Sequence, residues 1–392
     1  MYCINIHRKV DMKFTAMTCV AIALIVLATG TAGTAAPKAE ESKAAAKTPA
    51  GYPEFSWDTV PLCIHFGKTP AVMTDAEVKF VASRSPIVCL EKAHARQKLG
   101  STEKGIAHDA KRLKAANPKI KVLFYWNSFL NYHMYDACAE IKKHPDWFLR
   151  DAAGKLLLKK DHIEQYNLLN KEFRVWWAAM AARAIKEYNC DGIFVDAMLQ
   201  PYGWLRRGWP GATAAKLLIA QNDMLSRAKT NMGKDSILLY NGIRSVKSRE
   251  TKGTEFLPKA DGVMVEHFTA FHSADPVSIA RDIAAIQTAG RAGKLVIVKG
   301  WPSTGLKFTD RDARKRPAAS LAKEAKESIT FSLACYLVAA ERYSYFCYSW
   351  GYRENNGSFV DYPEFKRPLG TPKAQAVKTG NVYTRSFAHA DV

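Results

Sequence analysis

The stretch YNCDGIFVDAM, residues 188–198, decides the fold of this sequence. A turn signal, Asp191-Gly192, precedes the apolar, β-rich run 193–195, and the run stops at a carboxylate, Asp196. An amphipathic helix pattern leads into it, and a buried strand that ends on an acid is typical of a parallel α/β barrel. For Asp196 alone, capping of the next turn is an equally good explanation.

Seven further apolar runs alternate with helical segments, which indicates βα units and a parallel sheet. The eight predicted strands span residues 61–66, 86–90, 120–126, 191–196, 236–240, 262–266, 295–299 and 343–348. One intervening helix begins with Asp275 as N-cap and Pro276 in its first turn, with Ile279, Ile283 and Ile286 on one face. The predicted fold class is α/β, a (β/α)8 TIM barrel with a short C-terminal extension.

The chain divides into four predicted segments. Residues 1–36 contain Lys13, an apolar run and then small residues, the order of a secretory signal, with cleavage near Ala35 or Ala36. An uncleaved anchor is the alternative; cleavage leaves no stable membrane insertion and predicts a secreted or periplasmic protein. Residues 37–54 predict a disordered linker, residues 55–370 the barrel, and residues 371–392 a C-terminal strand and tail.

The composition is strongly basic. Lys and Arg number 57 against 37 Asp and Glu, a net charge of +20 that falls only to about +18 without residues 1–36. Six of the eight cysteines lie beyond the predicted signal, mostly in or beside apolar segments, which favours buried free thiols. Without an HExxH or paired-cysteine spacing, we expect neither a metal nor a cofactor. The oligomeric state stays open.

Every predicted strand ends on a polar or indole side chain. These endings are His65, Glu91, Trp126 with Asn127, Asp196, Asn241, Glu266 with His267, Lys299 with Trp301, and Ser349 with Trp350. A barrel brings the carboxyl ends of its strands into one cup, so all eight endings are candidates for a site.

Asp196 and Glu266 are the candidate catalytic pair. Glycoside hydrolysis needs two carboxylates, one that protonates the leaving oxygen and one that meets the oxocarbenium-like carbon. Aromatic rings stack on sugar C–H faces, and the predicted top loops carry Tyr132, Tyr135, Tyr202, Trp204 and Trp209. For any one of these rings, packing in the core or a loop is the better explanation.

The sequence also resembles a known family. DGIFVD (191–196), the Glu of VMVEHF (263–268), HPDWFLRDAAGK (144–155), YNLLNKEFRVWW (166–177), PLGTPKAQ (368–375) and VYTRSF (382–387) resemble hypothetical glycosyl hydrolase family 15. A more distant likeness is to the endo-α-1,4-polygalactosaminidases. The resemblance covers roughly residues 57–392. It implies that Asp196 is the nucleophile and Glu266 the acid/base of a retaining reaction. Such proteins continue VYTRSF into further strands, so either the closing segment is short here or the chain is truncated.

The predicted function is a secreted glycoside hydrolase that cleaves O-glycosidic bonds of a polysaccharide, with a raised pKa at Glu266. Two alternatives stay open, a catalytically silent carbohydrate-binding barrel, and a polysaccharide lyase or deacetylase that uses His65, Glu91 or His267. The residues predicted to bind substrate are His65, Glu91, Trp126, Asn127, Tyr202, Trp204, Arg206, Arg207, Asn241, His267, Lys299, Trp301 and Trp350.

The basic charge suggests an anionic substrate. Arg206 and Arg207 lie between Trp204 and Trp209, and Arg311, Arg314, Lys315 and Arg316 follow the seventh strand. Arginine binds sulfate or carboxylate bidentately while an indole stacks on the sugar, so a sulfated or uronic-acid polysaccharide is the hypothesis. A solvated surface, or general adhesion to nucleic acid or an acidic envelope, explains the charge as well. No specific nucleic-acid partner is expected.

Overall fold

The computed structural model describes residues 48–246, 250–271, 273–302, 316–380 and 382–392. Eight parallel strands form one sheet, in the order β1 (Cys63–Phe66), β2 (Ile87–Leu90), β3 (Lys121–Asn127), β6 (Gly192–Asp196), β7 (Ile237–Asn241), β10 (Gly262–Phe268), β11 (Leu295–Gly300) and β12 (Ser344–Tyr348). The amide of Phe346 donates to the carbonyl of Pro61 at 2.8 Å, which joins the last strand to the first. The sheet closes as a (β/α)8 TIM barrel, so the predicted fold class is confirmed.

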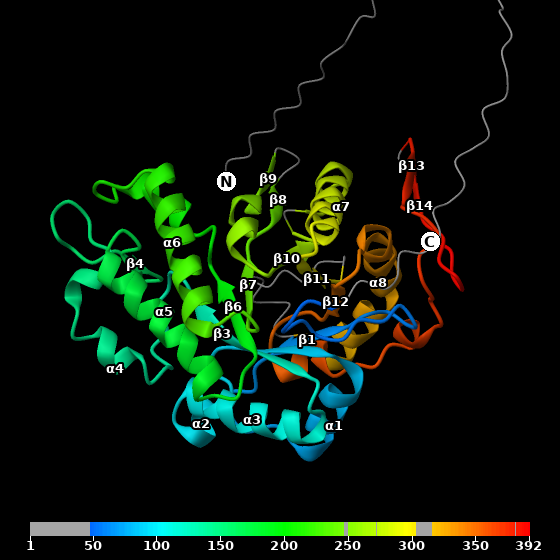
Figure 1. Cartoon of the computed structure of the whole chain (residues 1–392), viewed down its shortest axis with the longest axis horizontal. Helices are drawn as coiled ribbons and strands as arrows, with labels where there is room; N and C mark the ends of the chain where they lie inside the picture. Colours follow the sequence, from blue (N-terminus) through cyan, green and yellow to red (C-terminus); the bar gives the residue numbers. More distant parts are fainter. Residues whose placement is uncertain (1–47, 247–249, 272, 303–315, 381) are drawn as a thin grey trace, which may run out of the picture. The chain divides into compact units, whose positions relative to one another are not determined.

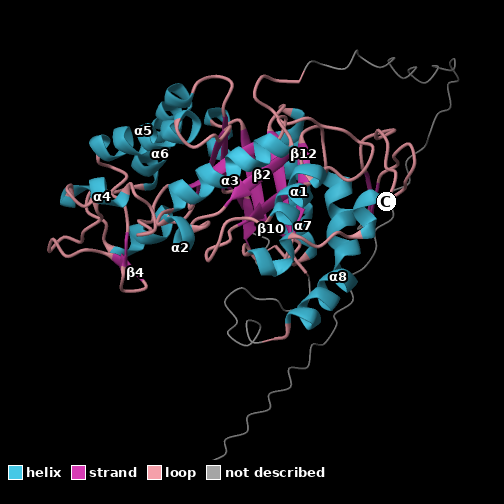
Figure 2. Cartoon of the chain, turned by 90° about the horizontal axis from the view of Figure 1, so that it is seen from below, coloured by secondary structure: helices cyan, strands magenta, loops and turns pink. Residues whose placement is uncertain are grey.

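Helices surround the strands (Figures 1 and 2). They are α1 (Asp75–Arg84), α2 (Arg96–Leu99), α3 (Thr102–Ala116), α4 (Cys138–Ile141), α5 (Lys171–Lys186), α6 (Ala214–Met232), α7 (Pro276–Arg291) and α8 (Ala318–Ala339). Three short pairs of strands lie outside the barrel, β4 (Leu158–Lys159) with β5 (Ile163–Glu164), β8 (Arg244–Val246) with β9 (Glu250–Lys252), and β13 (Val377–Thr379) with β14 (Val382–Thr384). Between β7 and β10 the connection carries the 3₁₀ helix η3 (Thr254–Lys259) in place of a long helix.

Local sequence signals explain where α7 begins and which face it buries. The side chain of Asp275 accepts hydrogen bonds from the amides of Val277 and Ser278, and Pro276 occupies the first turn. The three isoleucines expected on one face, Ile279, Ile283 and Ile286, are all buried. This helix prediction is therefore confirmed.

The strand β6 lies between β3 and β7 and is buried on both faces. Ile193, Phe194 and Val195 are at most 1% exposed, as is usual for parallel strands covered by helices. A Cβ at Gly192 would lie 2.1 Å from the carbonyl oxygen of Ile237, so only glycine lets β6 approach β7 here. The pairing continues from Gly192 and Ile237 to Val195 and Tyr240, so the end of β6, with Asp196, lies beside the end of β7.

The C-terminal segment packs against α8. The buried guanidinium of Arg385 donates to the carbonyls of Leu337, at 3.0 Å, and Ala340. These carbonyls lie at the end of α8, where a helix leaves its last acceptors unpaired, so Arg385 caps it. Phe387 is fully buried beside this contact.

Candidate active site

The two candidate catalytic carboxylates lie at the carboxyl end of the barrel and share a hydrogen-bond donor. Asp196 is the last residue of β6, and Glu266 lies near the end of β10. The Nδ2 atom of Asn241 is 3.0 Å from Asp196 Oδ1 and also 3.0 Å from Glu266 Oε2. Two contacts of 3.0 Å to one nitrogen limit the separation of these oxygens to at most 6.0 Å.

Asp196 accepts hydrogen bonds from side chains of the neighbouring strand β3. The hydroxyl of Tyr125 donates to Asp196 Oδ2, and Asn127 Nδ2 lies 3.4 Å from the same oxygen. The next residue, Ala197, has φ of 70°, a left-handed conformation that alanine adopts at a cost and that clusters at functional sites. The Asp196 carboxylate is thus held in place by three donors from β3 and β7.

Glu266 is held from three directions. The hydroxyl of Tyr352 donates to Oε1 at 3.0 Å, the guanidinium of Arg244 donates to Oε2 at 3.2 Å, and His267 Nε2 lies 3.7 Å from Oε2. The pairing of β10 with β11 shifts register between Val265 and Phe268, a bulge that spans Glu266 and His267. Such bulges re-aim side chains next to active sites.

The raised pKa that we predicted for Glu266 is not what this environment produces. Burial raises the pKa, but His267 and Arg244, together with hydrogen bonds from Asn241 and Tyr352, outweigh burial and lower it to about 2. Four groups that favour the charged form surround one carboxylate. Without a ligand, Glu266 is therefore ionised.

A second ionic group borders Asp196. His65 Nε2 lies 3.0 Å from Glu91 Oε1, and the amine of Lys92 donates to Glu91 Oε2 at 2.6 Å. Lys92 also lies over the ring of Tyr125, 4.4 Å from its centroid. Burial raises the pKa of Glu91, but Lys92 and His65 lower it more, so the carboxylate stays charged.

Two aromatic residues connect these groups. The indole of Trp301 donates to the backbone carbonyl of Glu266 at 2.6 Å, and its ring meets that of Tyr352 edge to face at 5.7 Å. The ring of Tyr352 in turn lies 4.6 Å from His65. We use the name cup for this set of side chains, which consists of His65, Glu91, Lys92, Tyr125, Asn127, Asp196, Asn241, Arg244, Glu266, His267, Trp301 and Tyr352.

Trp126 does not belong to the cup, although we predicted that it binds substrate. Its ring stacks on Trp177 of α5 at 6.2 Å, and its indole donates to the backbone carbonyl of Trp177 at 3.3 Å. Successive residues of a strand face opposite sides, so Tyr125 and Asn127 point inward and Trp126 points to the helices.

Lys299 and Trp350 also differ from the prediction. Lys299 is fully buried and its amine donates to Ser349, so it lies beneath the cup and cannot touch a glycan directly. The ring of Trp350 packs on Gly357, where a Cβ would lie 2.4 Å from it. Lys299 thus supports the site from beneath, and Trp350 packs within the loop that follows β12.

Four further predicted residues lie on the 3₁₀ helix η2 (Pro201–Arg207), which follows β6. The exposed guanidinium of Arg207 lies over the ring of Trp204, 4.5 Å from its centroid, and Arg206 is exposed. Burial raises the pKa of Tyr202 to about 12, with a further contribution from Glu255. Arg311, Arg314 and Lys315 lie outside the described residues, and Arg316 pairs with Glu324 at 2.6 Å.

Sequence reasoning missed four members of the cup. Lys92 follows the predicted ending Glu91, and Tyr125 lies two residues before Asn127, so strand alternation could have found Tyr125. Arg244 begins the short strand β8, Tyr352 comes from the loop after β12, and nothing in the local pattern identifies them.

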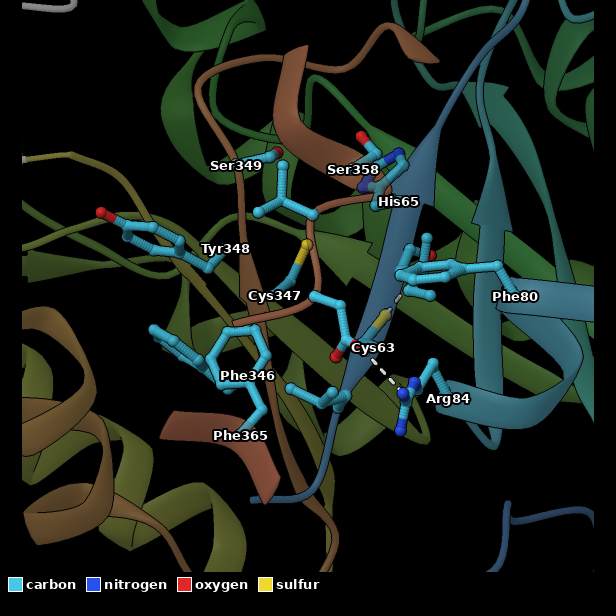
Figure 3. A pocket seen from close by; sticks show the side chains of 14 residues that line it. Cys63, His65, Phe80, Arg84, Phe346, Cys347, Tyr348, Ser349, Ser358 and Phe365 are labelled. Atoms are coloured by element: carbon cyan, nitrogen blue, oxygen red, sulfur yellow. Dashed lines mark hydrogen bonds and ion pairs between the residues drawn. The ribbon is translucent and has the colours of Figure 1, made fainter. Parts of the chain in front are cut away.

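A pocket lies at the seam between β1 and β12 (Figure 3). Its lining includes Cys63, Cys347, Phe80 and Phe365, with Arg84, which pairs with Asp361 at 2.6 Å. Neither Asp196 nor Glu266 lines this pocket. It shares His65 with the cup but does not include the candidate catalytic pair.

Other features of the described part of the chain bear on the class of site. The described cysteines, Cys63, Cys89, Cys138, Cys190, Cys335 and Cys347, are free thiols, all but Cys335 buried. No group of three or more His, Cys, Asp or Glu side chains there is arranged to hold a metal ion. None of the described helices is long and apolar enough to cross a membrane.

Similar proteins were found at the level of family and structure. No curated protein sequence matches the chain. Solved structures that match include an α-galactosidase from Thermus thermophilus in complex with p-nitrophenyl α-D-galactopyranoside, at 14% identity and TM-score 0.46, over 88% of this chain and 67% of that chain. Ega3 from Aspergillus fumigatus in complex with galactosamine matches at 14% identity and TM-score 0.45, over 82% and 98%. An α-amylase from Geobacillus thermoleovorans complexed with acarbose matches at 13% identity and TM-score 0.44, over 86% of each chain.

A family model matches well over half of the chain, residues 114–391, and is described as hypothetical glycosyl hydrolase family 15. The matched range begins in α3 and contains Asp196, Asn241, Glu266 and Tyr352. With this match and a barrel whose carboxyl end gathers two carboxylates, the chain belongs to hypothetical glycosyl hydrolase family 15.

Proposed function

We propose that this protein hydrolyses O-glycosidic bonds of a polysaccharide, with Asp196 and Glu266 as its catalytic residues. The observation that carries the proposal is the shared donor, Asn241, which keeps the nearest oxygens of the two carboxylates within 6.0 Å. A silent carbohydrate-binding barrel would not need two carboxylates so close together.

The proposed reaction retains the anomeric configuration. Asp196 attacks the anomeric carbon and forms a covalent glycosyl ester while Glu266 gives a proton to the leaving oxygen. Glu266 then takes a proton from water, which attacks the same carbon and releases Asp196. Retaining pairs lie about 5 to 5.5 Å apart and inverting pairs about 6.5 to 9.5 Å, so the upper limit of 6.0 Å between the nearest oxygens supports retention.

Glu266 must gain a proton before the first step, although its pKa is about 2 without a ligand. A glycan that excludes water and takes over the hydrogen bonds of Arg244 would raise this pKa toward the working range. The low pKa also favours a second assignment, in which Glu266 is the nucleophile and Asp196 the acid/base.

Azide rescue separates these two assignments. Asp196→Ala and Glu266→Ala are assayed on aryl glycosides with a good leaving group, chosen after a screen of polysaccharides with the wild type. We expect azide to restore the Glu266 variant and give a glycosyl azide of retained configuration, because azide replaces water in the second step. The Asp196 variant should give the inverted azide. The opposite pattern would exchange the roles, and a wild type inactive on all glycans would refute hydrolysis.

The substrate that we propose is anionic. Arg206 and Arg207 are exposed beside Trp204, and Lys159 bonds to Gln200 of the same loop at 2.8 Å and acts electrostatically on Asp196. Together with the net charge of +20, these cations favour sulfate or uronate groups. Paired neutral and sulfated glycans are compared over a salt series. If both kinds of glycan are cleaved equally, with no salt dependence and no loss of activity in an Arg206→Ala, Arg207→Ala double variant, the basic residues do not bind substrate and form only a charged surface.

The proposed site of action is outside the cytoplasm. The support is the signal-like order of residues 1–36, which lie outside the described residues. N-terminal mass spectrometry of the exported protein should show a new terminus at residue 36 or 37. A protein that stays in the cytoplasm with residues 1–36 uncleaved would contradict this.

A further inference from the structure

Lys299 is a buried cation that the proposed reaction does not use. It lies in β11, is 0% exposed, and its amine donates to the carbonyl of Ser349 at 2.6 Å, to the hydroxyl of Ser349 at 2.9 Å and to the carbonyl of Gly300 at 3.3 Å. An ammonium has three N–H donors, so these three acceptors match the charged form. Buried lysines are rare and need such pairing.

Both aromatic residues that hold Glu266 lie over this amine. It is 4.1 Å from the centroid of the Trp301 ring and 5.6 Å from that of Tyr352. Trp301 binds the backbone carbonyl of Glu266, and Tyr352 binds its carboxylate. The Lys299 amine therefore contacts both Trp301, which holds the backbone of Glu266, and Tyr352, which holds its carboxylate.

The hydrogen bonds of Ser349 extend this arrangement along the chain. Ser349, drawn in Figure 3 just after β12, donates from its hydroxyl to the carbonyl of Gly351 at 2.7 Å. Gly351 directly precedes Tyr352, whose own carbonyl accepts from the amide of Gly67 at 2.8 Å. The path from Lys299 to Tyr352 is thus continuous.

We propose that Lys299 is a positioning residue for catalysis, which orients Glu266 through Trp301 and Tyr352. This rests on the proposed catalytic role of Glu266. The simpler reading is that Lys299 only fills the barrel interior and ties β11 to β12, in which case its loss affects stability but not the pH dependence of the reaction.

The charge on Lys299 should change in an accessible pH range. Burial lowers its pKa to about 8, against the opposing influence of Cys347 on β12, Glu266 on β10 and Cys63 on β1. The neutral amine has only two N–H donors for three acceptors and loses its attraction to the two rings. We therefore expect activity to fall as pH rises through about 8.

The kinetic test uses Lys299→Met, Lys299→Arg and a matched control. Lys299→Met should lower kcat by about 10-fold or more, change KM by less than about 2-fold and replace the fall in activity near pH 8 by one set only by deprotonation of Glu266. Lys299→Arg keeps the positive charge, so the fall in activity with rising pH should move to higher pH. The control, Lys294→Met, removes a half-buried lysine that precedes the same strand at its other end and donates to Ala260 at 2.7 Å; it should keep the wild-type profile. An unchanged kcat and an unchanged fall in activity near pH 8 in Lys299→Met would overturn the proposal.

A second readout does not depend on activity. The Glu266 carboxyl is followed by ¹³C NMR in protein labelled at glutamate, with Glu266→Gln for assignment. We expect its titration to move to higher pH in Lys299→Met but not in Lys294→Met. If this shift occurs and no glycan is cleaved, hydrolysis fails while the positioning role stands; an unmoved titration overturns the role. Should Lys299→Met not fold, Ser349→Ala removes one acceptor of the same contact and should give a smaller shift in the same direction.

Discussion

Tyr352 donates a hydrogen bond of 3.0 Å to Glu266 across 86 residues of sequence. Tyr352 follows the last strand of the barrel, while Glu266 belongs to β10, so the carboxylate is oriented by a loop two strands away. The acid and its partner therefore meet only in the closed barrel.

Removal of this hydroxyl should raise the pKa of Glu266. A hydrogen bond to a charged group contributes about 1.5 to 3 kcal/mol, so Tyr352→Phe should raise the pKa by roughly 1 to 2 units. The ¹³C titration of Glu266 measures the change, and Tyr383→Phe in β14 serves as the control. A titration that does not move would mean that the hydroxyl does not hold the carboxylate in solution.

Replacement of Asn241 by Asp should disable the pair. The variant removes the donor that Asp196 and Glu266 share and adds a third negative charge between them. We expect kcat/KM to fall by at least about 100-fold. The matched comparison is Asn117→Asp, which removes an amide donor to the carbonyl of Ala82, at a position far from Asn241 in the sequence. This variant should retain activity. Near-normal activity of Asn241→Asp would argue against the shared donor.

Asp109 should contribute to stability above acidic pH. Burial raises its pKa, but hydrogen bonds from His94 and the amide of Met73 lower it by more, from the usual 3.8 to about 2. A depressed carboxyl pKa stabilises the fold above about pH 3.8, and this contribution, about 2 kcal/mol, is lost as pH falls toward 2. Urea unfolding should show Asp109→Asn less stable at pH 7 and the difference from wild type shrinking below pH 3.8. Asp235→Asn, at an exposed residue, should show neither effect.

Asp282 should behave in the opposite way. Burial raises its pKa to about 6, against hydrogen bonds from Ser245 and Ser273. A raised carboxyl pKa means that the fold loses stability as pH rises from about 3.8 to 6, because the unfolded chain ionises first. Asp282→Asn keeps an acceptor for the amide of Ser245 at 3.0 Å and removes the charge. We expect equal or greater stability at pH 7, by up to about 3 kcal/mol, whereas Asp282→Ala should destabilise. A strongly destabilised Asn variant would show that the charge itself is required.

The barrel could be predicted because its signals are local. Alternating strand and helix patterns, the cap at Asp275 and the isoleucines of α7 all act within a few residues. Closure of the sheet then follows from eight such units, and the acids at the ends of β6 and β10 are carried to one end by the fold.

The cup was harder to predict because single residues decide which face a side chain takes. Trp126 is one residue from Asn127, yet it faces the helices, while Lys299 lies within the buried strand β11 and beneath the site. Arg244 reaches Glu266 from the start of β8 and Tyr352 from the loop after β12, and the paths of both segments depend on tertiary contacts. The low pKa of Glu266 follows from these same contacts, so it could not be foreseen either.

Closure of the sheet between Pro61 and Phe346 also determines at which stage of translation the barrel can be completed. During translation β1 leaves the ribosome long before β12, and until then its outer edge has no partner strand. An unpaired edge is a template for other chains, so slow synthesis or a stall before β12 exposes the nascent protein to aggregation. Tyr352 emerges later still, and a ribosome-bound chain therefore passes through a stage that is nearly folded but not yet able to hold Glu266.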